Sequence, residues 1–366
     1  MSARRLIPIA LALVLAAAAC GSDNSSGSSG AATTGPAASA PGTTGAATTS
    51  GEKVTLRLGF FPNITHATAL VGVEQGIFAD KLGPNVKLET STYNAGPVAI
   101  EALFADAIDA TYIGPNPAIN GYAQSGGEAL RIISGATSGG ASLVVKPDIT
   151  GPADLKGKTV ASPQLGNTQD VALRTWLKDN GLSSDTSGGG DVSIKPQDNA
   201  ATLDAFKQDQ VQGAWVPEPW ATRLVQEGGG KVLVDEKTLW PQGQFVTTHL
   251  IVATKFLDDH PDVVKGLLEG QVAANDFVNK NPAEAQKAAN DQIEKITQKR
   301  INDTVIAAAW KNLTFTDDPV ASSLKASADH AIALDLLKPV DLSKIYDLGP
   351  LNEVLKAAGE PELSGL

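Results

Sequence analysis

The stretch Val54-Thr-Leu-Arg-Leu-Gly-Phe-Phe-Pro-Asn-Ile-Thr-His66 decides the fold class. It begins as an apolar β-rich run, and a loop with a proline then leads into a helical pattern in which Leu70, Val73 and Ile77 share one face. The same succession returns along the chain, with further strand candidates at 86–92, 110–113, 131–135, 158–162, 192–195, 213–216, 231–234 and 245–253. Strands that alternate with helices predict an α/β fold with mainly parallel strands.

The length of the body predicts two lobes. Residues 53–366 are too many for one small core. The segments Ser142–Lys146 and Thr247–Val252 are the expected connections, which places one lobe at 53–145 plus 250–366 and the other at 146–249. Two connections between lobes form a hinge, and a hinge implies a cleft.

The first residues have the layout of a signal peptide, expected at 1–19. Arg4 and Arg5 precede an apolar run that is too short to remain as a membrane-spanning helix. The run ends at Cys20, and the sequence before it resembles a bacterial lipobox, with Ala17 where leucine is usual. We therefore expect lipidation of Cys20, and ordinary cleavage after Ala19 with a free thiol is the alternative. Since Cys20 is the only cysteine, its lipidation would exclude thiol and cysteine-zinc chemistry.

Residues 20–52 are expected to form a disordered linker. The segment after Cys20 is almost wholly Gly, Ser, Ala, Thr and Pro, so it lacks the apolar side chains that would offset the entropy of ordering. The net charge of −11 gives no basic stripe for nucleic acid and would be repelled by anionic lipid. We therefore expect contact with the membrane only through the lipid anchor, on the extracytoplasmic face of the cell membrane.

Enzymatic motifs are sparse. The segment Gly151–Thr159 resembles a phosphate-binding P-loop, but five residues separate its glycines where four are needed, and its Gly-Lys-Thr enters a predicted strand. The four histidines belong to no His-Glu-x-x-His motif, and no Gly-x-Ser-x-Gly elbow occurs. We expect no catalytic residue, no cofactor and no metal.

Loops of Gly, Pro, Asn, Ser and Thr recur where a predicted strand ends and a helix begins. The N-terminus of a helix exposes unpaired N–H groups and about half a positive charge, so several converging on one cleft would hold an oxyanion without Lys or Arg. Plain helix capping is the alternative for each loop, and Asn167 is a natural cap. These loops are Phe61–His66, Gly114–Pro117, Ser138–Gly140, Gly166–Gln169 and Pro217–Trp220.

An ordered set of short motifs resembles a known family, the aliphatic-sulfonate, taurine and nitrate substrate-binding proteins of ABC importers. The resemblance spans residues 54–312 and implies the two-lobed periplasmic-binding-protein fold, with a small anion between the lobes and a membrane permease as partner of a monomer. The motifs are Leu58-Gly-Phe-Phe-Pro, Gln75-Gly-Ile-Phe, Ala107-Ile-Asp-Ala, Ile113-Gly-Pro-Asn-Pro117, Pro152-Ala-Asp-Leu-Lys-Gly-Lys158 and His260-Pro-Asp-Val-Val264.

The resemblance also implies a binding site. Carried over motif by motif, it points to Asn63, Thr65, His66, Gly114, Asn116, Asn167 and Thr168. The loops and their surroundings add Ser138, Trp215, Glu218 and His249 to the expected ligand-binding residues.

Some of these residues have two interpretations. Trp215 would pack the alkyl part of an organosulfonate or lie in the core, and Glu218 would pair with Arg223 or receive the ammonium group of taurine. His66 or His249 would titrate near pH 6.5 if a charged imidazole formed part of the site. An aliphatic sulfonate or taurine is the expected ligand. The alternatives are nitrate, bicarbonate, a phosphonate or a pyrimidine precursor of thiamine on the same fold, or an enzyme of the pyrimidine-synthesis type.

Overall fold

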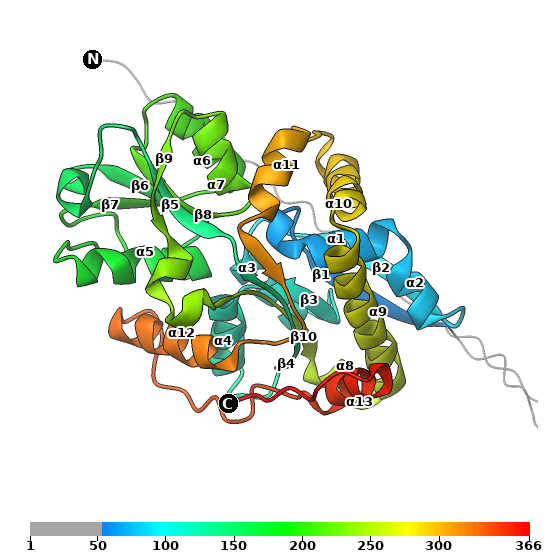
Figure 1. The fold of residues 1–366 in the computed structure, drawn as a ribbon. Coiled ribbons are helices and arrows are strands. Elements are labelled where there is room, and N and C mark those ends of the chain that lie inside the picture. Colours follow the sequence, from blue (N-terminus) through cyan, green and yellow to red (C-terminus); the bar gives the residue numbers. More distant parts are fainter. Residues whose placement is uncertain (1–52) are drawn as a thin grey trace, which may run out of the picture. The chain divides into compact units, whose positions relative to one another are not determined.

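The computed structural model describes residues 53–366. The predicted signal peptide, the predicted lipidation site Cys20 and the predicted linker lie outside the described residues. Within residues 53–366, no helix has both the length and the apolar character needed to cross a membrane. This part of the chain contains two β-sheets, each with helices packed on both faces (Figure 1). The predicted α/β class is therefore confirmed.

The first sheet has six strands in the order β11-β4-β10-β3-β1-β2. Strand β1 pairs in parallel with β2 and β3, whereas β10 runs antiparallel to β3 and β4. In β1, Leu56, Leu58 and Phe60 all point into one core, because side chains alternate along a strand. The strands are β1 (Val54–Phe60), β2 (Val86–Thr92), β3 (Ala110–Ile113), β4 (Leu130–Gly139), β10 (Val246–Ala253) and β11 (Leu313–Phe315).

Helices cover both faces of this sheet. One face carries a large core to which α1 (Ala67–Glu74), α2 (Ile77–Leu82), α8 (Thr254–Asp259), α9 (Pro261–Lys280), α10 (Pro282–Thr297), α11 (Asp303–Trp310) and α13 (Gly349–Ala358) contribute. The other face packs against α3 (Gly96–Phe104), α4 (Pro115–Gln124) and α12 (Ala321–Ala333). Leu70, Val73 and Ile77 do not share one helix as predicted, because Gly76 adopts a left-handed conformation (φ 71°) between α1 and α2.

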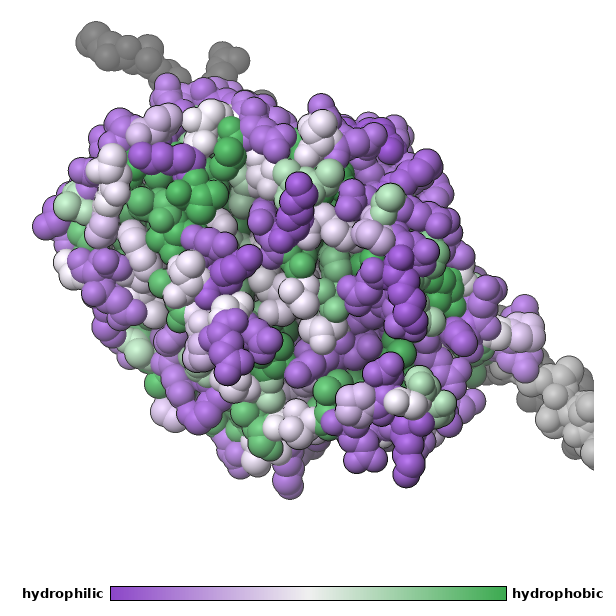
Figure 2. All heavy atoms as spheres, viewed as in Figure 1, coloured by the Kyte–Doolittle hydropathy of each residue, from purple (hydrophilic) through white to green (hydrophobic). Residues whose placement is uncertain are grey.

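The second sheet has five strands in the order β7-β6-β8-β5-β9. Leu173, Trp176 and Leu177 of α5 (Thr168–Asp179) pack on one face, and α6 (Asn199–Lys207) and α7 (Trp220–Gln226) pack on the other. Apolar residues gather in the upper left of Figure 2, where Figure 1 draws this sheet; Val232 of the edge strand β9 is 48% exposed. The strands are β5 (Ala141–Val145), β6 (Thr159–Ser162), β7 (Ser193–Pro196), β8 (Gly213–Pro217) and β9 (Lys231–Asp235). Short 3-10 helices lie at Ile64–His66, Pro152–Leu155, Glu236–Leu239 and Pro241–Gly243.

The expectation of mainly parallel strands is only partly met. Strands β5 and β10 run antiparallel to both of their neighbours. These are the strands that the chain enters directly on passing from one sheet to the other, without a crossover helix in the same sheet. A parallel neighbour requires such a crossover, so antiparallel pairing follows at these two places.

The chain passes between the sheets at Gly139-Gly140 and again within residues 236–245. Both glycines have positive φ (81° and 76°), and a Cβ at Gly140 would lie 2.0 Å from Cδ2 of Leu313. The lobe boundaries expected after residues 145 and 249 lie further along the chain than the points where it passes from one sheet to the other. The apolar run at Ser142–Val145 belongs to the second sheet, and Thr247–Val252 lies inside β10 of the first. Both runs are buried strands, and composition does not reveal which sheet a buried strand joins. That the two crossings act as a hinge stays a prediction.

A buried ion pair anchors the start of α5. The side chains of Asp170 and Arg174 are 0% and 3% exposed, and Nε of Arg174 donates to Oδ2 of Asp170 at 2.8 Å. The same carboxylate accepts from Ser162 Oγ (2.6 Å), at the end of β6, and from the Gly166 N–H (3.0 Å). One side chain thus joins the end of a strand, the following loop and the first turn of a helix.

Replacing Arg174 with leucine should lower the free energy of unfolding by about 3–5 kcal/mol, because it leaves the buried Asp170 carboxylate without its cation. Lys325→Leu is the matched control, since Lys325 forms an i,i+4 pair with Asp329 at 2.7 Å on an exposed face and should change stability little. Urea denaturation measures both. Equal unfolding midpoints for the two variants would contradict the anchoring role of Asp170 and Arg174.

Candidate functional site

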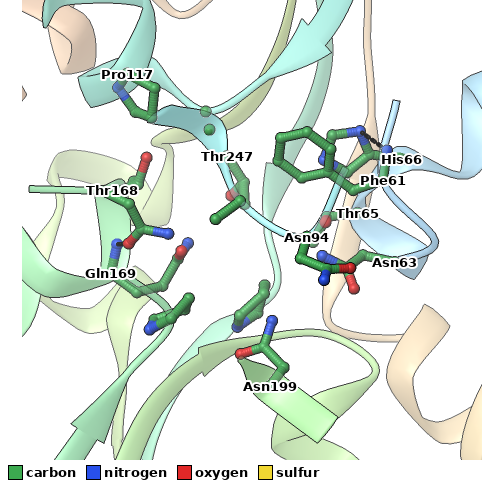
Figure 3. Close-up of a pocket in the computed structure, with 16 residues that line it drawn as sticks. Phe61, Asn63, Thr65, His66, Asn94, Pro117, Thr168, Gln169, Asn199 and Thr247 are labelled. Carbon is green, nitrogen blue, oxygen red and sulfur yellow. Dashed lines mark hydrogen bonds between the residues drawn. The ribbon is translucent and has the colours of Figure 1, made fainter. Parts of the chain in front are cut away.

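A small cavity lies where strand ends of both sheets face one another (Figure 3). The loops after β1, β2 and β3 form one side and those after β6, β7 and β8 the other, with Thr247 of β10 at the wall. Its volume is about 30 Å³, which is small for a ligand site. The lining residues are Phe61, Asn63, Thr65, His66, Asn94, Ala95, Gly96, Gly114, Pro117, Pro163, Asn167, Thr168, Gln169, Asn199, Pro217 and Thr247.

Neutral polar side chains dominate this lining. Among the described residues that form it there is no Lys, Arg, Asp or Glu. Its one imidazole, on His66, stacks on Phe61 with ring centroids 4.5 Å apart. Burial lowers the pKa of His66 to about 3, so the ring is neutral near pH 7. Nδ1 accepts the Phe61 N–H at 3.4 Å, which leaves the single ring proton on Nε2.

The N-terminus of α5 opens onto the cavity. Oδ1 of Asn167 accepts the N–H groups of Gln169 (3.0 Å) and Asp170 (3.2 Å), so Asn167 is a helix cap, as the alternative interpretation held. The Asn167 N–H donates to the carbonyl of Gln164. The N–H of Thr168 is then the amide of this turn with no partner among residues 53–366, at the positive end of a 12-residue helix.

The two sides of the cavity are in contact across the cleft. A Cβ at Gly114 would lie 2.4 Å from Oγ1 of Thr168, so only glycine allows this approach. Trp220 Nε1 donates to Oδ1 of Asn63 at 2.8 Å, and Asn312 Nδ2 donates to Oε1 of Glu218 at 2.6 Å. These bonds join elements of the first and second sheets. The conformation is therefore closed, and a solute larger than the cavity enters only if the lobes separate.

Six of the expected ligand-binding residues line this cavity: Asn63, Thr65, His66, Gly114, Asn167 and Thr168. In Figure 3, Thr168 and Gln169 face Thr65 and His66 from the opposite lobe. The structure thus brings together the three loops that the resemblance pointed to. Contact of these residues with a ligand stays a prediction.

The other five expected residues lie outside the lining, beginning with Asn116 and Ser138. Nδ2 of Asn116 donates to the Ser327 carbonyl at 3.1 Å, so this side chain holds α12. Oγ of Ser138 accepts the Phe245 N–H at 3.3 Å and faces a separate groove beside the crossing. The loop at Gly114–Pro117 contributes Gly114 and Pro117 to the lining, whereas no residue of the Ser138–Gly140 loop lines the cavity.

Of the two interpretations of Trp215, the structure supports the one that places its side chain in the core. Its ring is fully buried beside Trp176, with centroids 6.3 Å apart, and Nε1 donates to Oε2 of Glu236 at 2.7 Å. Burial raises the pKa of Glu236 to about 7. The Trp215 side chain is therefore satisfied within the second lobe and does not reach the cavity.

Glu218 points away from the cavity, but not toward the expected partner. Its carboxylate accepts the N–H (3.0 Å) and hydroxyl (2.9 Å) of Thr222 and the Asn312 amide. Burial raises its pKa. The expected pairing with Arg223 is wrong, because Arg223 binds Glu227 at 2.8 Å, one helical turn further on. Glu218 serves the contact between the lobes.

His249 belongs to the first lobe's core. Nε2 lies 2.9 Å from the Pro319 carbonyl, and the ring meets Tyr346 edge-on. Burial lowers its pKa to about 4. Neither His249 nor His66 is thus charged near pH 7. The structure therefore does not support a binding site that contains a charged imidazole.

The sequence argument missed several lining residues, notably Asn94 and Asn199. Asn94 follows β2 and Asn199 opens α6 after β7. Both strands were predicted, so applying the same rule to their exits would have found these side chains. For metals, no cluster of three or more His, Cys, Asp or Glu side chains occurs within the described part of the chain.

Solved structures with the same architecture include the alkanesulfonate-binding protein of Xanthomonas axonopodis pv. citri bound to MOPS, with a TM-score of 0.65, 20% identity, and coverage of 79% of this chain and 96% of that one. The nitrate-binding protein of Synechocystis PCC 6803 gives a TM-score of 0.72, 17% identity, and coverage of 85% and 90%. At these identities the likeness shows the fold, which is the expected two-lobed periplasmic-binding-protein fold. Both of these neighbours are named as binding proteins.

The profile of the NMT1-like family matches residues 49–291, so the chain belongs to that family. A relative, the taurine-binding periplasmic protein of Escherichia coli (strain K12), is 26% identical over 214 residues, or 58% of this chain and 64% of that protein. The expected kinship with substrate-binding proteins is confirmed. The relatives and neighbours named here are binding proteins, which at the level of the family supports a solute-binding protein rather than an enzyme.

We expect the imidazoles of His66 and His249 to stay neutral from about pH 8 down to about pH 5, because burial lowers their pKa values to about 3 and about 4. A freely exposed histidine becomes mostly protonated over that range. Proton–nitrogen NMR spectra of the ring nitrogens, assigned with His66→Phe and His249→Phe, measure this. For His66 they should show the proton on Nε2; a titration of either ring near pH 6.5 would contradict the burial argument.

Proposed function

We propose that the protein captures an aliphatic sulfonate or taurine in the interlobe cavity and delivers it to the permease of an ABC importer. The observation that carries this proposal is the lining itself. Hydrogen-bonding groups from both lobes meet there, and the described lining residues include no charged side chain.

The charge of the ligand follows from this lining. A desolvated anion needs compensation from hydrogen-bond donors or cations. A sulfonate carries a single negative charge over three oxygens, which neutral donors and the start of α5 suit. A phosphonate dianion would bring a second charge to a wall whose described residues include no Lys or Arg, at a much larger cost of desolvation.

The relatives support this class of ligand. The names of two of the similar proteins specify taurine and alkanesulfonate. Nitrate is the second candidate, since one structure of this fold binds nitrate and the closed cavity of about 30 Å³ favours a very small anion. Both ligands are monoanions, so both fit the neutral lining.

The lining supports binding rather than catalysis. A general base or nucleophile needs a group poised to exchange a proton near neutral pH. His66 is the one titratable side chain among the described lining residues, and its pKa of about 3 keeps it neutral without making it a useful acid. The alternative of a pyrimidine-synthesis-type enzyme, with His66 acting chemically, therefore has little support.

Delivery to a permease requires that the closed form be recognised. The lobes are joined by the bonds Trp220–Asn63 and Asn312–Glu218. A ligand that contacts both lobes binds the closed form better than the open one and shifts the population toward closure. The permease then distinguishes the loaded protein from the empty one by its shape.

Thr65→Val and Thr168→Val remove one cavity hydroxyl from each lobe at nearly constant volume. Each should weaken binding of taurine or ethanesulfonate by about 1.5–3 kcal/mol, because a hydrogen bond to a desolvated anion is lost. Isothermal titration calorimetry measures the two affinities for the parent protein and both variants.

Thr175→Val is the matched control for this experiment. Thr175 lies on the same helix as Thr168 and is not part of the cavity lining. Its hydroxyl is buried and has no hydrogen-bond partner within residues 53–366. It should bind the sulfonates as tightly as the parent protein. If Thr65→Val and Thr168→Val do so too, the ligand lies elsewhere.

We also propose that Cys20 is lipidated after removal of residues 1–19 and holds the protein on the extracytoplasmic face of the membrane. The support is the lipobox-like Ala17-Ala18-Ala19-Cys20 and the position of Cys20 as the single cysteine. Cys20→Ser should move the protein from the membrane fraction to the soluble extracytoplasmic fraction, with ligand affinity unchanged. Retention of Cys20→Ser in the membrane fraction would refute the anchor.

A further inference from the structure

The side chain of Asn199 enters the interlobe cavity from the second lobe (Figure 3). Asn199 is the first residue of α6 and follows β7 and the N-cap residue Asp198. The Gln197 N–H donates to the carbonyl of Ser162, the last residue of β6, which holds this loop at the carboxyl edge of the sheet. Ligands of α/β sheets bind beyond that edge. Asn199 therefore stands where a side chain can contact a ligand.

The amide oxygen of Asn199 is a buried acceptor without a hydrogen-bond partner among residues 53–366, and the residue is only 8% exposed. A buried acceptor left unpaired carries the full penalty of desolvation. Two other asparagines of the same lining are satisfied. The amide oxygen of Asn63 accepts from Trp220, and that of Asn167 accepts from the first turn of α5. The unmet acceptor of Asn199 thus indicates a place for a donor that the ligand brings.

The lining around this acceptor suits a neutral donor. The described lining residues include no Asp or Glu, so an ammonium group would be desolvated there without a carboxylate to offset its charge. A hydroxyl group costs far less to desolvate and supplies the one hydrogen bond that the amide oxygen lacks. A hydroxyl group is therefore the donor that best fits Asn199.

We propose that Asn199 is a specificity-determining residue whose amide oxygen accepts a hydrogen bond from a hydroxyl group of the ligand. The protein then selects small hydroxylated monoanions over alkyl monoanions of the same size. This inference rests on the proposed function, which places the anionic group in this cavity. An analogue without the hydroxyl group leaves the acceptor unpaired, and sites of this kind discriminate strongly against such analogues.

Closure of the cleft makes the contact selective. Nδ2 of Asn94, on the first lobe, donates to the carboxylate of Asp198 at 3.4 Å, so the first lobe covers the turn that carries Asn199. When the lobes separate, water reaches the Asn199 amide, whereas in the closed form the occupant of the cavity must supply the donor. The hydroxyl group therefore contributes more to the affinity of the closed form than to that of the open form.

The test compares hydroxyethanesulfonate with propanesulfonate by isothermal titration calorimetry and uses the ratio of the two affinities. These ligands have the same charge and nearly the same size, and a hydroxyl group in one replaces a methyl group in the other. Asn199→Leu removes the acceptor, whereas Asn199→Asp keeps an acceptor and removes the amide donor. Asn180→Leu is the control, because Asn180 is an exposed residue of the same lobe, at the end of α5 and outside the cavity lining.

We expect hydroxyethanesulfonate to bind at least about tenfold more tightly than propanesulfonate in the parent protein and in Asn180→Leu. In Asn199→Leu the ratio should fall to about one. In Asn199→Asp both affinities should fall, because a carboxylate repels the anion, but the ratio should stay at about tenfold or more. A purely structural role of Asn199 would weaken both ligands equally and leave the ratio unchanged.

Four results would overturn this inference. A parent ratio of one or less, with both sulfonates bound, would show that the ligand does not supply the donor and would leave the proposed function standing. A high ratio that survives Asn199→Leu would place the acceptor on another residue. A ratio that falls to one in Asn199→Asp as well would show that the amide donates to the anion instead. Binding of neither sulfonate to the parent protein would refute both the proposed function and the role of Asn199.

Discussion

The start of α5 is the element on which the rest of the site depends. A helix that begins at a cavity wall leaves N–H groups to satisfy. Asn167 caps two of them, and Asp170, held by Arg174 and Ser162, fixes the turn so that the Thr168 N–H remains free for a solute. The positive end of the helix then acts where no cation is present among the described lining residues. A displacement of this turn would remove the Thr168 N–H from the cavity wall.

Closure depends on the same geometry. Gly114 lets the first lobe approach Thr168 to a distance that any side chain would prevent, and the glycine pair at 139–140 turns the chain between the sheets in a left-handed conformation. The side-chain hydrogen bonds across the cleft include Trp220 to Asn63, Asn94 to the carboxylate of Asp198 and Asn312 to the carboxylate of Glu218. Such contacts hold the lobes together weakly, so that binding of a solute would shift the population from the open to the closed form.

The sequence predicted the succession of strands and helices, and therefore the loops that surround the cavity, because the periodicity of apolar residues reflects burial directly. It did not predict side-chain direction. Asn116 and Thr168 occur in similar loops, yet Asn116 turns to α12 while Thr168 faces the cavity. Nor did it reveal that the run at 141–145 belongs to the second sheet, since a buried strand has the same composition in either. The direction of a side chain and the sheet that a strand joins both depend on tertiary packing, which local sequence patterns do not contain.

The lining of the interlobe cavity restricts its ligand by charge. No described lining residue is a Lys or Arg, so each additional negative charge on the ligand would be desolvated without a cation to offset it. A monoanion would therefore have the lowest desolvation cost. Because the polar groups of the lining come from both lobes, that monoanion would be fully bound only in the closed form.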